Sequence, residues 1–169
     1  GVSLGDRTVV VTNNDDAYLT ALALKKAGLD VPAIIDARQG GAGELGEKAR
    51  ELGIRVEKGK GIAKVTGGKR ITGLQICAQA GEGTAMEEIA CDCLAMSGGW
   101  SPVVHLWSHC GGKLLWDTDK VMFRPDKDKA PTGHDGTPFV SVVGAANGHL
   151  SQHAVLRDAT DQTAAVSGV

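Results

Sequence analysis

The chain has 169 residues, of which 42% are hydrophobic and 4% aromatic, and its formal net charge is −2. That length allows one domain with a sizeable core or two small domains. The charge gives no electrostatic reason to expect nucleic acid or an anionic membrane as a partner, and the few aromatic residues argue against a base-stacking surface.

Strands and helices alternate in the first third of the chain. An apolar run over Thr8–Thr12 predicts a strand, and the apolar spacing over residues 15–27 predicts a helix packed on a sheet. The sequence predicts a second strand at residues 31–36, a second helix at residues 44–52 and a third strand at residues 54–57. Strands joined by helices lie parallel, with right-handed crossovers, so we expect the first two strands to pair in parallel.

The ends of these helices carry recognisable signals. Asn14 or Asp15 can cap the start of the first helix, and Gly28 can end it in a left-handed turn. In the second helix, Leu45, Ala49 and Leu52 are expected to face inward.

The pattern then changes to antiparallel strands. Residues 62–66 and 70–78 alternate apolar and polar side chains around a turn at Gly67 and Gly68, which predicts a hairpin. The run IACDCLAM at residues 89–96 reads as a further strand. We therefore expect three antiparallel strands before the chain returns to the parallel sheet.

The four cysteines are Cys77, Cys91, Cys93 and Cys110. Cys91 and Cys93 stand two apart in the predicted strand, so they share one face and cannot easily bond to each other. We interpret the cysteines as buried thiols of a reducing cytoplasm rather than as a metal or redox site. The sequence also contains no apolar run near the ~20 residues of a membrane-spanning helix and no recognisable signal peptide.

Loops dominate the chain after Ser97. A polar stretch over residues 125–138 precedes a predicted strand at 139–143, and residues 149–166 form a predicted final helix. We expect weaker order in residues 125–138 than in residues 8–96.

Two pairs of histidines have helical i, i+4 spacing, which can bind zinc. His149 and His153 lack a cysteine or acid clearly placed to complete such a site, and His105 and His109 have only Cys110 beside them. We therefore expect no metal site. No serine–histidine–acid arrangement has motif support, so no catalytic residue is assigned.

The turn TNNDD at residues 12–16 stands where a dinucleotide-binding unit has its glycine-rich phosphate loop. Asparagine side chains block the approach of a pyrophosphate to the backbone, and the two carboxylates repel it. We expect the isolated chain to bind NAD weakly or not at all. Asp36 ends the second strand, where such domains hold a ribose, and we interpret it as a turn or cap residue or a partner of Arg38, with a ribose contact as the alternative.

Three runs of sequence resemble a known family. The alpha subunit of heterotetrameric sarcosine oxidase contains stretches similar to VVVTNNDDAYLTAL, SGGWSPVVHLWSHCGGKLLWD and VVGAANG. The most specific of these is SGGWSPVVHL at residues 97–106. The order of elements resembles the nested nucleotide domain of flavin-dependent pyridine nucleotide-disulfide oxidoreductases. The resemblance implies an α/β, Rossmann-like, three-layer fold with a parallel sheet and an antiparallel β-meander. Residues 1–96 would be a nested NAD(P)-binding-type domain, and 97–169 part of an outer dinucleotide-binding domain with a C-terminal helix.

The same resemblance implies an activity. The family oxidatively demethylates sarcosine to glycine, with tetrahydrofolate as one-carbon acceptor and O2 as oxidant. NAD would be held in the intact alpha subunit, with FAD and FMN in the complex and the other subunits of the heterotetramer as partners. The family's alpha subunit is several times longer, so this chain would be an inactive fragment. The alternatives are a subunit of another amine-, opine- or proline-oxidising flavoprotein complex, and a structural module that binds no nucleotide.

The resemblance also places two turns beside a cofactor in the intact subunit. The first follows a strand end, where the backbone can approach a ligand, the alternative being a tight turn with a packed tryptophan. The second closes the last predicted strand and opens the last helix, whose N-terminus favours a pyrophosphate. The residues concerned are Gly98, Gly99, Trp100, Gly144, Ala145, Ala146 and Asn147.

Overall fold

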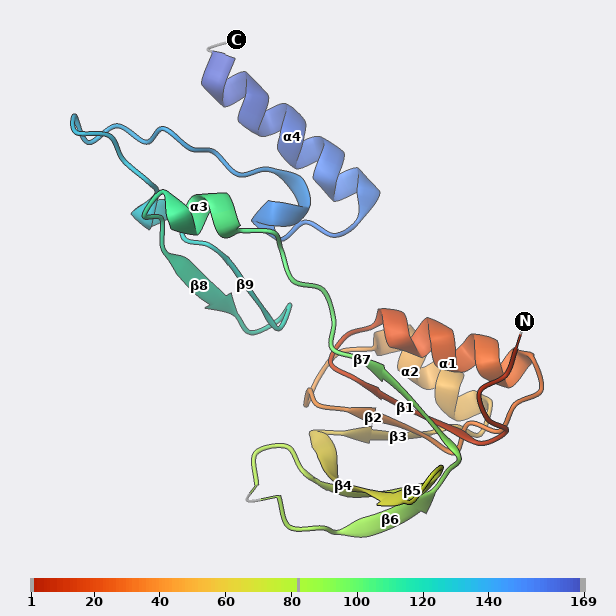
Figure 1. Ribbon diagram of the computed structural model, residues 1–169. Helices are drawn as coiled ribbons and strands as arrows, with labels where there is room; N and C mark the ends of the chain where they lie inside the picture. The colour runs from red at the N-terminus through yellow and green to blue at the C-terminus, as the bar shows by residue number, and fades with distance from the viewer. Residues whose placement is uncertain (1, 82, 168–169) are drawn as a thin grey trace. The chain divides into compact units, whose positions relative to one another are not determined.

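The computed structural model describes residues 2–81 and 83–167. The chain divides into two compact units, unit 1 (Gly1–Gly99) and unit 2 (Trp100–Val169) (Figure 1). Within the described ranges, no helix combines the length and the apolar character that crossing a bilayer requires.

A four-stranded parallel sheet forms the middle layer of unit 1. Its strands, in spatial order, are β3 (Arg55–Lys58), β2 (Ala33–Asp36), β1 (Thr8–Thr12) and β7 (Cys93–Ser97). Val10 lies opposite Ile34, which confirms the predicted parallel pairing of the first two strands. The Rossmann-like α/β fold class is thereby confirmed.

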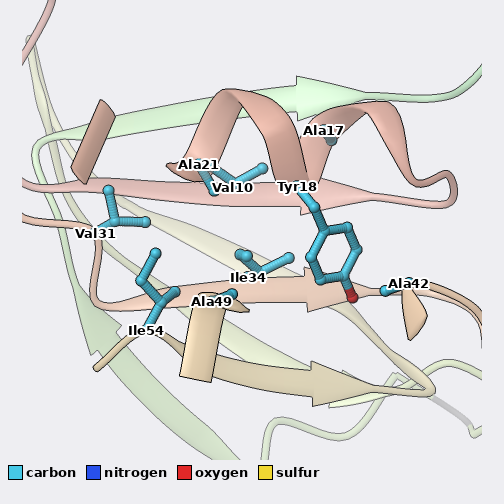
Figure 2. Close-up of a cluster of buried hydrophobic side chains, with 9 residues drawn as sticks. All are labelled: Val10, Ala17, Tyr18, Ala21, Val31, Ile34, Ala42, Ala49 and Ile54. Carbon is cyan, nitrogen blue, oxygen red and sulfur yellow. The ribbon is translucent and has the colours of Figure 1, made fainter. Parts of the chain in front are cut away.

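Two helices and a second sheet complete the three layers. Figure 1 shows α1 (Asp16–Lys26) and α2 (Gly43–Glu51) on one face of the parallel sheet, with the strands β4, β5 and β6 on the other. Because successive side chains of a strand point to opposite faces, the parallel sheet contributes to two cores. Ile34 packs with Tyr18 under the helices (Figure 2), whereas Ile35 packs with Leu74 of the second sheet.

The helix ends follow the sequence signals in part. Asp15 occupies the N-cap position of α1 but its side chain makes no capping hydrogen bond. The Oδ1 atom of the preceding residue, Asn14, accepts a hydrogen bond from the Asp16 amide at 3.1 Å. Gly28 follows the helix with a φ of 90°, the left-handed conformation expected of it. The inward position predicted for Leu52 is wrong: α2 ends at Glu51, and Leu52 is 49% exposed.

The second sheet is antiparallel, with β4 (Lys60–Gly67), β5 (Ile71–Ala78) and β6 (Glu87–Ala90) in that order. The pairing of β4 with β5 confirms the predicted hairpin at Gly67 and Gly68. This sheet is the predicted β-meander.

The run at residues 89–96 forms two strands, and the prediction of one was wrong. β6 ends at Ala90 in the antiparallel sheet, and β7 begins at Cys93 in the parallel sheet. Between them, the Asp92 carboxylate accepts hydrogen bonds from the amides of Asp6 at 3.1 Å and Arg7 at 2.8 Å. These bonds fix the passage of the chain from one sheet to the other.

All four cysteines are free thiols. Cys77 and Cys91 are buried and Cys93 is half-buried, but Cys110 is exposed, so the prediction of buried thiols fails there. Cys91 precedes β7, so it does not share a strand face with Cys93. Burial and the nearby charge of Asp92 raise the pKa of the Cys91 thiol.

Unit 2 consists of short elements followed by one long helix. They are α3 (His105–His109), β8 (Leu114–Asp117), β9 (Met122–Pro125), the 3₁₀ helices η1 (Lys127–Lys129) and η2 (Gly144–Asn147), and α4 (Gln152–Ser167). β8 and β9 form an antiparallel hairpin in which the rings of Trp116 and Phe123 meet edge to face, with centroids 4.9 Å apart. The sequence reading treated this segment as loop and missed the hairpin.

Two further predictions in unit 2 are corrected. Residues 139–143 are not a strand, because no neighbouring strand pairs with them within residues 2–81 and 83–167. Gly144–Asn147 forms a separate 3₁₀ helix and does not open α4, which starts at Gln152. His149 therefore lies before α4 and does not share a helix with His153.

Candidate functional site at the carboxyl edge of the parallel sheet

The strand order identifies where a ligand would bind in unit 1. In open α/β sheets, ligands bind at the carboxyl ends of the strands, at the point where the strand order reverses. In the order β3-β2-β1-β7 this point lies between β1 and β7. The turn after β1 and the end of β7, with Gly98 and Gly99 after it, flank this point.

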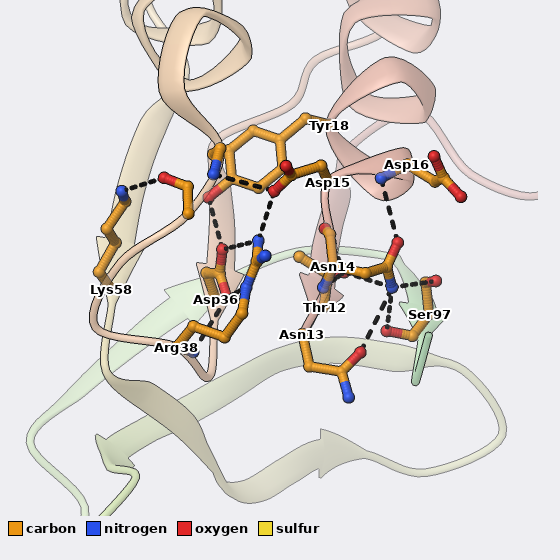
Figure 3. A network of polar contacts seen from close by, with 12 residues as sticks. Thr12, Asn13, Asn14, Asp15, Asp16, Tyr18, Asp36, Arg38, Lys58 and Ser97 are labelled. Carbon is orange, nitrogen blue, oxygen red and sulfur yellow. Dashed lines mark hydrogen bonds and ion pairs between the residues drawn. The ribbon is translucent and has the colours of Figure 1, made fainter. Parts of the chain in front are cut away.

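The side chain of Asn14 bridges this point (Figure 3). Its Nδ2 atom donates to the Ser97 hydroxyl at 3.0 Å and to the Ser97 carbonyl oxygen at 3.4 Å. The Asn14 amide in turn donates to the Thr12 hydroxyl at 3.0 Å. The two strand ends are thus tied together by a side chain where a nucleotide domain leaves a crevice.

The predicted cofactor residues after β7 have different surroundings. Gly99 has a φ of 80°, a left-handed conformation that favours glycine, and a Cβ atom there would stand 2.8 Å from the Asn13 Oδ1 atom and displace that side chain. Gly98 has open space beside it. Trp100 begins unit 2 and is 61% exposed, so the packed tryptophan of the tight-turn alternative is not seen.

Asp36 is fully buried at the end of β2, and both of its oxygens are occupied. Oδ1 accepts from the Arg38 amide at 3.0 Å and from Arg38 Nε at 3.1 Å. Oδ2 accepts from Arg38 Nη2 and from the Tyr18 hydroxyl, each at 2.9 Å. Asp36 is therefore the ion-pair partner of Arg38, and a ribose hydroxyl would have to displace one of these donors.

The same network perturbs its members' proton affinities. Burial, together with the hydrogen bond to Asp36, raises the pKa of Tyr18. Burial works against the charge on Arg38, but the two carboxylates outweigh it and raise the pKa of the guanidinium. Tyr18 thus remains neutral and Arg38 charged under ordinary conditions.

Asp15 is a second carboxylate partner of the Arg38 guanidinium. Its Oδ1 atom accepts from Arg38 Nη2 at 2.8 Å and from the Ala42 amide at 2.9 Å. Burial opposes ionisation of Asp15, but these two hydrogen bonds and the charges of Arg38 and Lys58 lower its pKa overall. The edge therefore holds two carboxylates around one guanidinium.

This edge has hydrogen-bonding groups but no pair of side chains suited to nucleophilic or acid–base catalysis. The Asn14 side chain already accepts a hydrogen bond from the Asp16 amide, the first of α1, at the helix end where a pyrophosphate would bind. Across the described ranges, no group of three His, Cys, Asp or Glu side chains is arranged to hold a metal ion.

The predicted cofactor turn in unit 2 is organised around Asp158. The Gly144 amide donates to the Asp158 carboxylate at 2.7 Å, and Asn147 Nδ2 donates to both carboxylate oxygens at 3.1 and 3.2 Å. Asn147 is 4% exposed, and its Oδ1 atom is buried without a hydrogen-bond partner. On the same 3₁₀ helix, Ala145 is exposed and Ala146 half-buried.

Sequence reasoning singled out Asp15, Asp36 and Arg38 but missed Tyr18 and Asp158. Asp158 lies among the apolar residues of the predicted last helix, and an acidic residue in that place was the available signal for a buried carboxylate. Tyr18 gave none, because its hydroxyl meets a residue 18 positions away.

The chain has close relatives among known proteins, although no family model matches it. It is 37% identical over 123 residues to the sarcosine oxidase subunit alpha of Rhizobium meliloti (strain 1021), and 38% identical over 130 residues to that of Corynebacterium sp. (strain P-1). These alignments cover 73% and 75% of this chain. The chain is a relative of the sarcosine oxidase alpha subunit. It spans 12% and 13% of the lengths of these two alpha subunits.

Solved structures similar to this sarcosine oxidase alpha relative share its fold at low sequence identity. LpdA from Mycobacterium tuberculosis superposes with a TM-score of 0.60 and 16% identity, over 98% of this chain and 35% of LpdA. Thioredoxin reductase from T. acidophilum superposes with a TM-score of 0.57 and 16% sequence identity, over 90% of this chain and 47% of the reductase. The flavoprotein disulfide reductase RclA from Escherichia coli superposes with a TM-score of 0.54 and 13% sequence identity, over 97% of this chain and 36% of RclA. At these identities, the three structures show what fold the chain has.

Proposed function

We propose that the chain is part of the alpha subunit of a sarcosine oxidase-like flavoenzyme complex. The complex would oxidatively demethylate sarcosine to glycine in the cytoplasm, with tetrahydrofolate accepting the one-carbon unit and O2 as oxidant. The observation that carries this proposal is the 37% identity over 73% of the chain to a sarcosine oxidase subunit alpha. The other subunits of a heterotetramer would be its partners.

Within such a subunit, the two units have different roles. Residues 1–96 would form the nested NAD(P)-binding-type domain, with Asp36 near NAD. Residues 97–169 would belong to the outer dinucleotide-binding domain, with Gly98, Gly99, Trp100 and the η2 residues near the cofactor. FAD and FMN would reside in the complex. Since the described residues include no catalytic constellation, the chain alone is proposed to have no turnover.

Activity of the complete complex tests the proposal. The full reading frame that contains this sequence would be expressed with its partner subunits and supplied with sarcosine, proline or an opine in separate assays. We expect oxygen consumption and glycine formation with sarcosine, together with tetrahydrofolate-dependent capture of the one-carbon unit. Turnover of proline or an opine without turnover of sarcosine would favour another amine-oxidising complex.

A second candidate function is a structural module that binds no nucleotide. The Asn14–Ser97 bridge supports it, because that bridge closes the point where a nucleotide would enter. Calorimetric titration of the isolated chain with NAD distinguishes the two roles of unit 1. A dissociation constant near ~1 μM, about −8 kcal/mol, would exclude the structural module.

A further inference from the structure

The loop between β2 and α2 has an unfavourable backbone. Gly41, Ala42 and Gly43 have φ values of 84°, 65° and 38°. A left-handed backbone is costly for a residue that carries a Cβ atom, so Ala42 needs compensating contacts.

Three side chains from three elements supply those contacts. Asp15, from the turn after β1, accepts a hydrogen bond from the Ala42 amide at 2.9 Å. Lys58, at the end of β3, donates to the Gly41 carbonyl oxygen at 2.6 Å. Arg38 packs against the same loop, since a Cβ atom on Gly41 would stand 2.6 Å from its Cζ atom.

Arg38 connects this loop to the buried carboxylate. A single nitrogen, Nη2, donates to Asp15 at 2.8 Å and to Asp36 at 2.9 Å. Asp15 therefore holds the Ala42 amide and the Arg38 guanidinium at once, and the guanidinium covers Asp36. The loop, the turn after β1 and the end of β2 form one connected arrangement (Figure 3).

We propose that Asp15 is a latch that keeps residues 38–43 closed over the end of β2 and keeps Arg38 on Asp36. A nucleotide can then reach Asp36 only after the latch opens. This inference rests on the proposed function, because the nucleotide in question is its NAD. Only the open fraction of molecules binds, so the observed affinity falls in proportion to that fraction.

The experiment compares the wild-type chain with an Asp15→Ala variant. Hydrogen exchange at the Ala42 amide reports on the latch, and NAD titration reports on access to Asp36. We expect exchange at Ala42 to rise at least tenfold and NAD to bind at least tenfold more tightly. A Glu44→Ala variant is the matched control, since Glu44 is an exposed carboxylate beside the loop that pairs with Lys48 at 3.6 Å, and it should change neither readout.

Exchange at the Ile34 amide, in the middle of β2, checks that the variant remains folded. If Asp15→Ala does not fold, a Lys58→Met variant replaces it. This variant frees the Gly41 carbonyl and keeps both carboxylate side chains in place. It should change both readouts in the same direction but by less.

The possible results separate the latch from the proposed function. Unchanged exchange at Ala42 would overturn the latch and leave the proposed function untouched. If exchange at Ala42 is faster but NAD binds equally tightly to both proteins, with micromolar affinity, the claim that the latch blocks access to Asp36 would be overturned. The proposed nucleotide role of unit 1 would be supported. Faster exchange with no NAD binding to either protein would overturn the claim that the latch controls access to Asp36, and would favour the structural module as the role of unit 1.

Discussion

The two units are stabilised in different ways. Both hydrophobic clusters found among the described residues lie in unit 1, on either side of its parallel sheet. In the described part of unit 2, the buried large apolar side chains are Trp107, Met122 and Pro125. Several others are exposed there, namely Val103, Leu106, Trp116, Phe123, Phe139, Leu150 and Leu156.

The comparison shows which unit can account for its own stability. Unit 1 buries apolar side chains in two layers, the usual main source of folding free energy. Unit 2 relies more on polar contacts, such as those of Asp158, and on the ion pair between Arg124 and Asp117 at 2.6 Å. Its exposed apolar side chains are the kind of surface that other protein segments cover.

The tryptophans allow each unit to be followed separately. Trp100, Trp107 and Trp116 are the three tryptophans of the chain, and all lie in unit 2. Tryptophan fluorescence during urea unfolding therefore reports on unit 2, and hydrogen exchange at buried sheet amides such as Val10 reports on unit 1.

The largest expected effect is that of Arg38→Ala in unit 1. The variant leaves buried Asp36 without its counter-charge and without two side-chain hydrogen bonds. Because Arg38 itself is 16% exposed, the loss should lie near the lower end for a buried pair, about 3 kcal/mol. Exchange at Val10 measures it, and the tryptophan transition should not move.

Arg50→Ala is the control for this prediction. Arg50 pairs with Glu47 on the surface of α2, so its removal should cost less than ~0.5 kcal/mol. Equal effects of the two variants would contradict the role assigned to Asp36.

Asp158→Ala should destabilise unit 2 by about 2 kcal/mol. It leaves the Gly144 amide and the buried Asn147 side chain without their acceptor. The tryptophan transition should shift to lower urea, with no change in exchange at Val10. Asp161→Ala, an exposed acid on the same helix, should have little effect; a shift as large as that of Asp158→Ala would show that α4 charge, not the buried contact, is responsible.

A smaller loss, about 1 kcal/mol, is expected for Tyr18→Phe, which removes one hydrogen bond to Asp36 and keeps the ring in its core. Exchange at Val10 again provides the measurement. A loss as large as that of Arg38→Ala would mean that the hydroxyl, not the guanidinium, is the main partner of Asp36.

The smallest effect concerns acid. Burial opposes ionisation of Asp158, but hydrogen bonds from Gly144 and Asn147 and the charges of His149 and Lys127 lower its pKa. A lowered folded-state pKa contributes stability that is present above the unfolded value and lost as pH falls through the folded value. We expect the stability of unit 2 to fall below about pH 5, less steeply in Asp158→Asn. If the stability of unit 2 falls equally steeply with decreasing pH in both proteins, Asp158 is not the group responsible for the loss.

The sequence predicted the parts of the fold that follow from local patterns. Thr8–Thr12, α1 and the hairpin at Gly67 were confirmed because apolar period and turn chemistry specify them. The break at Asp92 was missed because alternation continues across it, and the evidence lies in contacts with residues 85 and 86 positions away.

The candidate site was predictable only in outline. The glycine-free turn and Asp36 are visible in the sequence, but the Asn14–Ser97 bridge and the Asp15–Ala42 bond join residues 83 and 27 positions apart. A strand at residues 139–143 was expected from composition, yet a strand also requires a neighbour, which composition cannot supply. The prediction that residues 125–138 are less ordered than residues 8–96 awaits hydrogen exchange.

The parallel pairing of β1 with β7 has a consequence for mechanical load. Their register runs from Thr8 opposite Cys93 to Thr12 opposite Ser97. Because the two strands are parallel, Thr8 and Ser97 lie at opposite ends of this pair. A pulling force applied between Thr8 and Ser97 would therefore act along the strands and load the evenly spaced hydrogen bonds together, rather than opening them one after another.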